Sequence, residues 1–321
     1  MNRLLNIFTL IALLFFSLAC SQPQRVVMGY LAVRDTKCID KIQTLDWSIL
    51  THVLPSFCWV MDDASVDFSD VDRILPALKG SARTNKVKLI ASFKSGKKGN
   101  FKNAISDEAK RELLASNICD YVISRSFDGV DIDYEDYPMS DTDLTNLLDL
   151  FERLRSKLGR NHQMICAING SDWIDYGREW HTYFDYINVM IYDYGMFSST
   201  PVQHASMELF KNQINRCVEN FDIPREKIVG GIPLYGYSWK NGVSQPKAVP
   251  FSRIIDDSKG SADVLEGEYV DSTYYNGRSI IREKCQYIKE NGFAGVMVWQ
   301  LAHDSFNPSE KLMSAINDSF K

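Results

Sequence analysis

Three carboxyl residues spaced by two, Asp131, Asp133 and Glu135, have the types and spacing that best suit proton transfer in this chain. On a β-strand such positions share one face, about 6.6 Å apart along the chain. Carboxylates held this close disfavour each other's ionisation, so part of the group keeps a proton near neutral pH. A protonated carboxyl at the end of such a strand can act as a general acid. We therefore predict that Glu135 is the catalytic acid, that Asp133 holds or releases a shared proton, and that Asp131 tunes Asp133.

The residues between and before the acids indicate which way the row faces. Val130, Ile132 and Tyr134 alternate with the carboxyl residues and would face a layer of helices, which directs the acids into the interior of a barrel. A solvated acidic strand is the alternative interpretation, and it leaves the apolar residues unexplained. Asp128 has the wrong parity for the row, so we assign it a structural role. Gly129 is expected to permit a backbone conformation or a close approach that a side chain would obstruct.

The elements that must position this row repeat along the chain as strand and helix. Short apolar runs typical of strands lie at residues 26–33, 50–57, 87–93, 129–134, 164–168, 186–192, 228–233 and 294–299. Helix-like segments lie between them, one opening at Ser106-Asp107 and the others at 143–157, 206–221, 279–290 and 308–320. Continuous apolar strands that alternate with helices predict a parallel sheet covered on both faces. Eight such units in about 295 residues predict a single (β/α)8 TIM barrel over residues 25–321, without a large inserted domain.

The acid row resembles the signature of glycoside hydrolase family 18. That signature, D-x-x-D-x-D-x-E on the fourth barrel strand, is matched in full by Asp128, Asp131, Asp133 and Glu135. The resemblance extends over nearly all of residues 26–304, because further motifs follow in the expected order.

These further motifs lie on other strands of the expected barrel. Met190-Ile-Tyr192-Asp193, at the end of the sixth strand, is similar to the family's M-x-Y-D. The remaining residues that resemble its substrate-binding set are Trp299 on the eighth strand, Tyr30 on the first and Phe57 on the second, together with Met190 of the motif. The acid row, the M-x-Y-D match and Trp299 follow one another on the fourth, sixth and eighth strands, as in the family, and this order makes the resemblance specific.

The resemblance implies substrate-assisted hydrolysis with net retention, an exception to the usual two-carboxylate scheme. Glu135 would protonate the glycosidic oxygen while the substrate's own 2-acetamido oxygen attacks the anomeric carbon, giving an oxazolinium intermediate. Asp133 would orient the acetamide N–H, and Tyr192 would bind its carbonyl, with Asp193 bracing the pocket. Trp299 would stack under the sugar. The implied substrate is chitin or a chitooligosaccharide, cleaved at a β-1,4 bond next to N-acetylglucosamine, and no metal or cofactor is needed.

The ends of two strands depart from the family pattern. The third strand should end in S-x-G-G, but here Lys94 and Ser95 stand where glycines are usual, so Lys94 is expected to reach toward Asp131 or to alter the pocket. The seventh strand usually ends in Y-G-R, and here Tyr237 replaces the Arg. The segment 239–275 also lacks room for the inserted domain of processive chitinases. These departures put substrate length and preference in doubt, and they favour a shallow groove with endo-action or short oligosaccharides.

Two rival functions remain open on the sequence. An endo-β-N-acetylglucosaminidase that cleaves the chitobiose core of N-glycans would use the same acid row and intermediate. Tyr134 and the intact motif ending at Asp193 favour the chitinase type over it. The second rival function is that of an inactive glycan-binding lipoprotein. Family members of that kind typically lose the acid, and Glu135 is present.

The N-terminus predicts export. A short cationic start precedes an apolar run that ends at Ala19-Cys20, so residues 1–19 read as a signal peptide of the lipoprotein type and Cys20 as the lipidated residue. Ser17 stands where the bacterial lipobox usually has Leu, and simple cleavage near Ala19 is the alternative. We expect the protein at the bacterial cell envelope, anchored in the outer membrane, with a periplasmic or secreted location as the alternative.

Composition limits the possible partners. The net charge of −5 and the lack of a large basic cluster argue against nucleic acid or an anionic membrane surface, so membrane contact is expected only through the lipid. The cysteines other than Cys20 have wide spacings without a metal-type motif and are read as buried free thiols. We expect a monomer whose partner is a saccharide containing N-acetylglucosamine.

Overall fold

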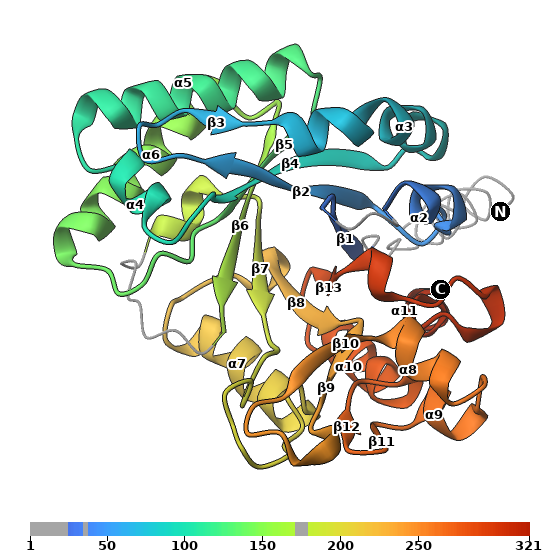
Figure 1. Ribbon diagram of the computed structural model, residues 1–321. Coiled ribbons are helices and arrows are strands. Elements are labelled where there is room, and N and C mark those ends of the chain that lie inside the picture. The colour runs from blue at the N-terminus through green and yellow to red at the C-terminus, as the bar shows by residue number, and fades with distance from the viewer. Residues whose placement is uncertain (1–24, 35–37, 171–178) are drawn as a thin grey trace, which may run out of the picture.

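The computed structural model describes residues 25–34, 38–170 and 179–321 (Figure 1), so the expected signal peptide 1–19 and Cys20 lie outside the described residues. Within these residues eight parallel strands form a closed barrel: β1 (Val26–Ala32), β2 (His52–Val60), β4 (Lys88–Ser95), β5 (Gly129–Asp133), β6 (Gln163–Asn169), β7 (Tyr186–Met190), β8 (Ile228–Pro233) and β13 (Gly295–Trp299). β1 pairs with both β2 and β13, which closes the barrel. The predicted single (β/α)8 barrel is confirmed.

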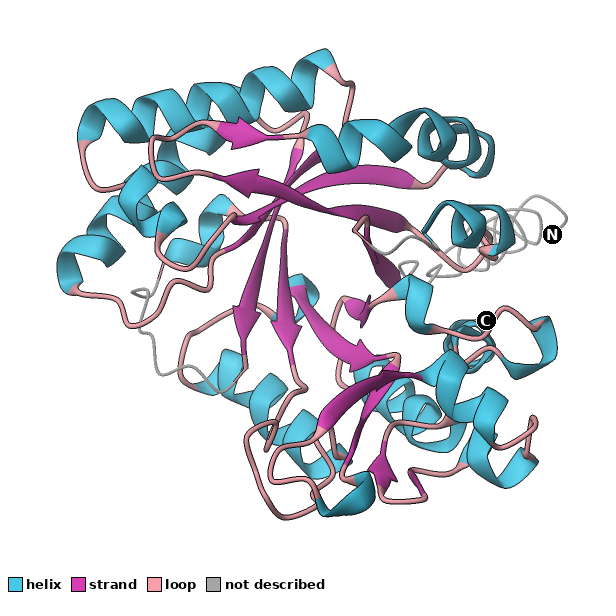
Figure 2. Ribbon diagram, in the orientation of Figure 1, coloured by secondary structure: helices cyan, strands magenta, loops and turns pink. Residues whose placement is uncertain are grey.

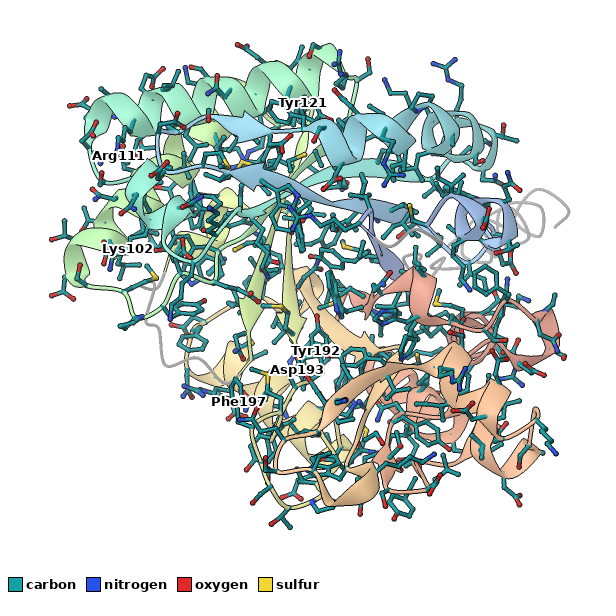
Figure 3. The ribbon with its side chains drawn as sticks, viewed as in Figure 1. Lys102, Arg111, Tyr121, Tyr192, Asp193 and Phe197 are labelled. Atoms are coloured by element: carbon teal, nitrogen blue, oxygen red, sulfur yellow. The ribbon has the colours of Figure 1, made fainter. Side chains whose placement is uncertain are left out.

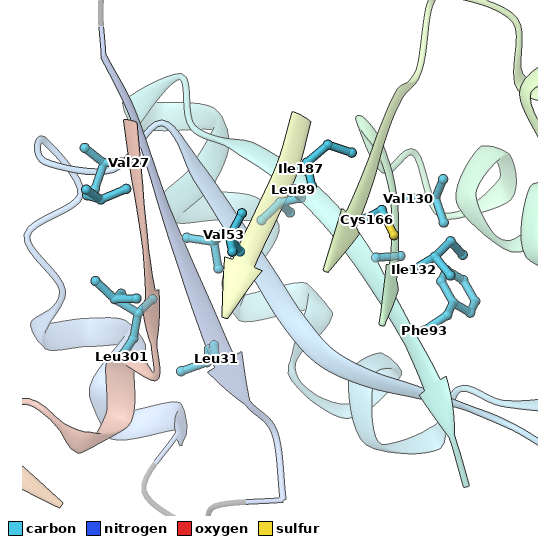
Figure 4. Close-up of a cluster of buried hydrophobic side chains, with 14 of the residues drawn as sticks. Val27, Leu31, Val53, Leu89, Phe93, Val130, Ile132, Cys166, Ile187 and Leu301 are labelled. Carbon is cyan, nitrogen blue, oxygen red and sulfur yellow. The ribbon is translucent and has the colours of Figure 1, made fainter. Parts of the chain in front are cut away.

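Side chains alternate between the two sides of each barrel strand, as the period of two requires. Figure 4 shows outward-facing side chains of the main buried cluster, among them Val27, Val53, Val130, Ile132 and Ile187. A second buried cluster fills the barrel interior with residues of the opposite parity: Val26, Met28, Tyr30, Leu54, Ile90, Ile165, Val229, Ala294 and Met297. The acids of β5 therefore face inward, because their neighbours Val130 and Ile132 face outward.

Helices cover the outside of the barrel (Figure 2). The longer ones in the described residues are α3 (Ser69–Asn85), α5 (Glu108–Ser124), α6 (Asp141–Leu158), α7 (Met207–Glu219), α10 (Arg278–Glu290) and α11 (Met313–Phe320), with the shorter α2 (Cys38–Thr44) and α4 (Asn100–Ala104). Helix α5 begins after Asp107, at the predicted start, and α6 ends at Leu158 with Gly159 as its C-cap. The segment predicted as one helix at 308–320 is divided, since Pro308–Glu310 forms a 3-10 turn before α11. No helix in these ranges has the length and apolar character to cross a membrane.

The connection after β8 forms a small antiparallel sheet instead of a domain. Its strands are β9 (Tyr235–Ser238), β10 (Lys247–Pro250), β11 (Tyr269–Val270) and β12 (Thr273–Tyr274), with α8 (Phe251–Asp257) and α9 (Ala262–Glu266) between them. A two-residue strand, β3 (Val66–Asp67), pairs antiparallel with the end of β2. The expectation of a barrel without a large inserted domain is confirmed.

Six cysteines within the described residues are buried, as predicted: Cys38, Cys58, Cys119, Cys166, Cys217 and Cys285. Burial raises the pKa of the Cys119 thiol to about 12, which keeps it protonated and unreactive. These thiols contribute to packing.

Candidate active site

The site is built on the register between β4 and β5. Ser92 lies opposite Asp131, and Lys94 lies opposite Asp133. Gly129 begins β5 where the neighbouring strand passes very close, since a Cβ there would lie 2.2 Å from the Gln163 carbonyl oxygen. The predicted close approach at Gly129 is therefore present.

Asp128 serves the backbone, as its parity indicated. Its Oδ2 accepts a hydrogen bond from the Leu89 amide at 2.8 Å. This bond ties the entrance of β5 to the start of β4, below the acid row.

Asp131 is the deepest member of the row and is fully buried. Its Oδ2 accepts hydrogen bonds from Ser92 Oγ at 2.6 Å and from Tyr30 Oη at 3.1 Å, and Asn188 Nδ2 in turn donates to Tyr30 Oη at 2.9 Å. Burial raises the pKa of Asp131 to about 8, against the effect of the Ser92 hydrogen bond, which favours the anion. Asp131 thus keeps its proton at neutral pH, and Tyr30 acts as its support from β1.

Asp133 and Glu135 share one cation. Lys94 Nζ lies 2.9 Å from Asp133 Oδ2 and also forms an ion pair with Glu135 Oε2. Lys94 therefore reaches the upper two acids and makes no hydrogen bond to Asp131, because the register sets it opposite Asp133. Burial raises the pKa of Asp133 to about 6, although the Lys94 charge opposes the rise.

Glu135 is the exposed end of the row. Strand β5 ends at Asp133, so Glu135 lies in the segment that follows it, at the C-terminal end of the barrel where catalysis takes place in such folds. Its side chain is 38% exposed, whereas that of Asp133 is 4% exposed. Glu135 is thus the carboxyl of the row that a substrate reaches from solvent.

Tyr192 and Asp193 follow β7 on another side of the barrel mouth, and Phe197 lies farther along the same segment (Figure 3). Asp193 Oδ1 accepts hydrogen bonds from Tyr235 Oη and, at 3.0 Å, from Tyr237 Oη of β9. Burial raises the pKa of Asp193, while these two hydroxyl groups favour its anion. Tyr237, which occupies the place of the expected Arg, thus holds the carboxylate of Asp193 in position.

Aromatic side chains form the floor of the site. The Trp299 ring packs 5.7 Å from the Phe57 ring in a stacked arrangement and 5.7 Å from the tilted Tyr30 ring, measured between centroids. Met190 and Tyr192 pack against the same interior cluster as Trp299. The predicted substrate-binding residues are therefore brought together, with Tyr30 deeper than expected because it binds Asp131.

Sequence reasoning missed several supporting residues. Ser92 and Asn188 precede Lys94 and Met190 by two positions, so strand parity was a signal that could have found them. Tyr235 and Tyr237 alternate on β9 in the same way. Asp304, which follows β13, is buried and accepts hydrogen bonds from the Leu312 and Met313 amides, so it supports the start of α11.

Within the described chain no three or more His, Cys, Asp or Glu side chains are arranged to hold a metal ion. An exposed carboxyl above two buried ones, beside an aromatic floor at the C-terminal end of a (β/α)8 barrel, characterises a glycoside hydrolase. A family model described as "Glycosyl hydrolases family 18" matches residues 26–304. The chain belongs to this family and is a glycoside hydrolase.

Solved structures and curated proteins similar to this chain include chitinases. A chitinase from Bacteroides thetaiotaomicron is 36% identical, with a TM-score of 0.87 over 92% of this chain and 96% of its own. The GH18 chitinase ChiB from the chitin utilization locus of Flavobacterium johnsoniae is 25% identical, with a TM-score of 0.79 over 92% of this chain and 94% of its own. Endochitinase 1 of Metarhizium robertsii is 27% identical over 270 residues, which cover 68% of this chain and 62% of that protein. The chain spans about three fifths of the length of this relative and of two other fungal chitinases that it matches.

Proposed function

We propose that this enzyme hydrolyses β-1,4 bonds next to N-acetylglucosamine in chitin or chitooligosaccharides, by substrate-assisted catalysis with retention. The observation that carries the proposal is the free oxygen of Asp133. Its Oδ1 is buried and has no hydrogen-bond partner in the part of the chain that the structure describes. A buried acceptor without a donor is costly, and the N–H of a bound 2-acetamido group would satisfy it.

The proposed reaction begins with proton transfer. Glu135 gives its proton to the glycosidic oxygen as the bond to the anomeric carbon breaks. The acetamide oxygen forms a bond to that carbon, and Asp133 stabilises the positive charge of the oxazolinium ion. Water then attacks the anomeric carbon from the side of the departed group and gives a proton back to Glu135, so the configuration is retained. No second catalytic carboxylate is required.

Two residues on other strands would complete the pocket. Tyr192 lies beside the row and would donate its hydroxyl to the acetamide carbonyl, with Asp193 held next to it by two tyrosines. Trp299 would support the sugar ring from below. The names of the similar proteins, which are chitinases and an endochitinase, support chitin as the substrate.

The decisive experiment is product analysis by mass spectrometry on chitooligosaccharides and on an N-glycoprotein. We expect release from chitooligosaccharides, and a loss of about 10²–10⁴-fold in rate for Glu135→Gln because the proton donor is removed. Glu219→Gln, at an exposed position at the end of α7, is the matched control and should retain full activity. Release from the N-glycoprotein alone would favour the endo-β-N-acetylglucosaminidase. Release from neither substrate, or equal release by the Glu135 variant, would contradict the enzymatic proposal and leave a glycan-binding role.

We also propose that residues 1–19 direct export and that Cys20 carries a lipid at the cell envelope. Arg25, the first described residue, lies beside β1 and donates to the Phe293 carbonyl just before β13, at the N-terminal end of the barrel. The acid row opens at the opposite, C-terminal end. This arrangement supports an anchored enzyme whose site faces away from the membrane.

A further inference from the structure

Lys94 lies at the centre of the acid row, at a position where the family signature has glycine. It is the penultimate residue of β4, and its side chain is 24% exposed. The ammonium group contacts Asp133 at 2.9 Å and Glu135, and it lies 5.1 Å from the centre of the Phe57 ring. Strand register therefore directs a cation into the group of carboxyls that performs the reaction.

The surroundings of Lys94 are otherwise acidic or neutral. The titratable groups that interact with it are Asp131, Asp133 and Glu135 from β5 and the segment after it, and Asp193 after β7. Tyr30 and Tyr192 interact with the acids of the row. Among the described residues, Lys94 is the cation within ion-pair distance of this row.

Lys94 remains charged in this setting. Burial alone would lower the pKa of Lys94, but the charges of Asp133 and Glu135 outweigh that effect and raise it above its ordinary value. Asp133 feels the reverse effect, since burial raises its pKa and the Lys94 charge holds it down. Asp131, which has no ion-pair partner, has the higher pKa of the two buried carboxyls.

We propose that Lys94 is a positioning residue of the reaction: its ammonium group holds Asp133 and Glu135 as one ion-paired unit and so sets the pH range in which the site works. The proposal rests on the proposed function in one respect, the need for ionised Asp133 beside the oxazolinium ion. Lys94 occupies Oδ2 of Asp133 and leaves Oδ1 for the acetamide N–H. It also occupies Oε2 of Glu135, so Oε1 is the oxygen available to the glycosidic bond.

Lys94→Met tests this, because methionine keeps the length of the side chain without its charge, and Lys94→Arg keeps the charge. Without the cation, Asp133 holds its proton to higher pH. The acid limb of the kcat/KM profile therefore shifts to higher pH. Removing a neighbouring opposite charge shifts a carboxyl by about 1–3 pH units, and each unit lowers the rate about tenfold at a fixed pH on that limb. Lys94→Arg should restore the wild-type limb.

The experiment combines pH profiles on a chitooligosaccharide with ¹³C titration of the Asp133 carboxyl, assigned through Asp133→Asn. The proposal is supported if, in Lys94→Met, both the acid limb of the kcat/KM profile and the titration midpoint of Asp133 lie at higher pH than in the wild-type enzyme. A rate that is lower by the same factor at every pH, with the acid limb and the Asp133 midpoint at their wild-type pH values, would overturn it. Lys94 would then only support packing. If the wild-type enzyme cleaves no substrate, the proposed function fails, and the ¹³C titration still decides the role of Lys94.

The titration also covers the case in which Lys94→Met does not fold, as judged by circular dichroism. In the wild-type protein the midpoint of Asp133 must then lie below that of Asp131, which is buried without an ion-pair partner. An Asp133 midpoint equal to or above that of Asp131 would show that Lys94 does not hold Asp133 ionised.

Discussion

Asp131 is surrounded by hydroxyl groups, of which Ser92 and Tyr30 bind one of its carboxyl oxygens. The other oxygen, Oδ1, has no hydrogen-bond partner within the described residues. Burial is the first cause of the raised pKa of both Asp131 and Asp133, and the charge of Asp133 comes later for Asp131. The row was predicted to keep a proton near neutral pH, and the pKa values of Asp131 and Asp133 are raised accordingly. Burial contributes more to this rise than the neighbouring like charges do.

Asp131→Asn should change how stability depends on pH. The pKa of Asp131 is about 8 in the folded protein and 3.8 as its ordinary value, so the folded state binds more protons between these pH values. Stability from this group is fully present below pH 3.8 and is lost as the pH rises to about 8. Asparagine does not titrate, so the variant should lack this fall, at about 1.4 kcal/mol for each unit of pKa difference.

Urea unfolding at pH 5 and pH 8 measures this effect. Asp120→Asn, at an exposed position in α5, is the matched control and should follow the wild-type curve. Parallel pH dependence for Asp131→Asn and the wild-type protein would mean that Asp131 is ionised in the folded state.

At the scale of elements, the contact between neighbouring strands decides which residues meet. Strand parity alone predicted that Asp131 and Asp133 share a face. The pairing of Lys94 with Asp133 depends on the register of β4 against β5, and a shift of one residue would turn the Lys94 side chain out of the barrel. Gly129 at the start of β5 protects this register through its close contact with β6.

Gly129→Ala should therefore lower both stability and activity. A Cβ would lie 2.2 Å from the Gln163 carbonyl oxygen. Because this oxygen belongs to the backbone, the clash is relieved only if β5 and β6 move apart. We expect a loss of about 1–3 kcal/mol in the free energy of unfolding, with a lower kcat because the acid row moves.

Gly80→Ala is the matched control for this substitution. Gly80 lies inside α3, and a Cβ there would meet nothing within 4 Å. Alanine is the better helix former, so we expect a gain of up to about 1 kcal/mol. Urea unfolding compares the two variants, and equal effects at both positions would refute the close-contact explanation.

At the scale of the whole molecule, the first and last parts of the barrel are tied together. β1 pairs with β13, and the buried Lys41 of α2 donates to the carbonyl groups of Asp304 and Ser305 before α11. These contacts join residues more than 260 positions apart in the chain. The pairing of β1 with β13 and the hydrogen bonds of Lys41 thus fasten the first strand and helix to the last part of the chain where the barrel closes.

Cys20→Ala tests the proposed anchor on the whole protein. We expect the variant to be exported and released from the membrane fraction, with no incorporation of labelled fatty acid, because the acylated thiol is absent. Cys119→Ala, which removes a buried thiol from α5, should remain with the membranes. Membrane retention of the Cys20 variant equal to that of the wild-type protein would contradict lipid anchoring at this residue.

The sequence by itself determined the kinds of element and the chemistry of the acid row. Apolar runs that alternate with amphipathic segments specify strands and helices locally, and the spacing of two places Asp131 and Asp133 on one strand face. The number of strand–helix units added the closed barrel, and the family motifs added the places of Tyr192 and Trp299. These features depend on neighbours in the chain, so they can be read without knowledge of the fold.

Only the tertiary structure decided which groups face one another. The ion pairs of Lys94, the hydrogen bonds of Asn188 to Tyr30 and of Tyr237 to Asp193, and the deep burial of Asp131 all join residues distant in sequence. Strand register and desolvation control these contacts, and neither is encoded in the periodicity of one segment. The identity of the acid is therefore a local property, whereas the raised pKa values of Asp131 and Asp133 and the ion pairs of Lys94 come from the closed barrel.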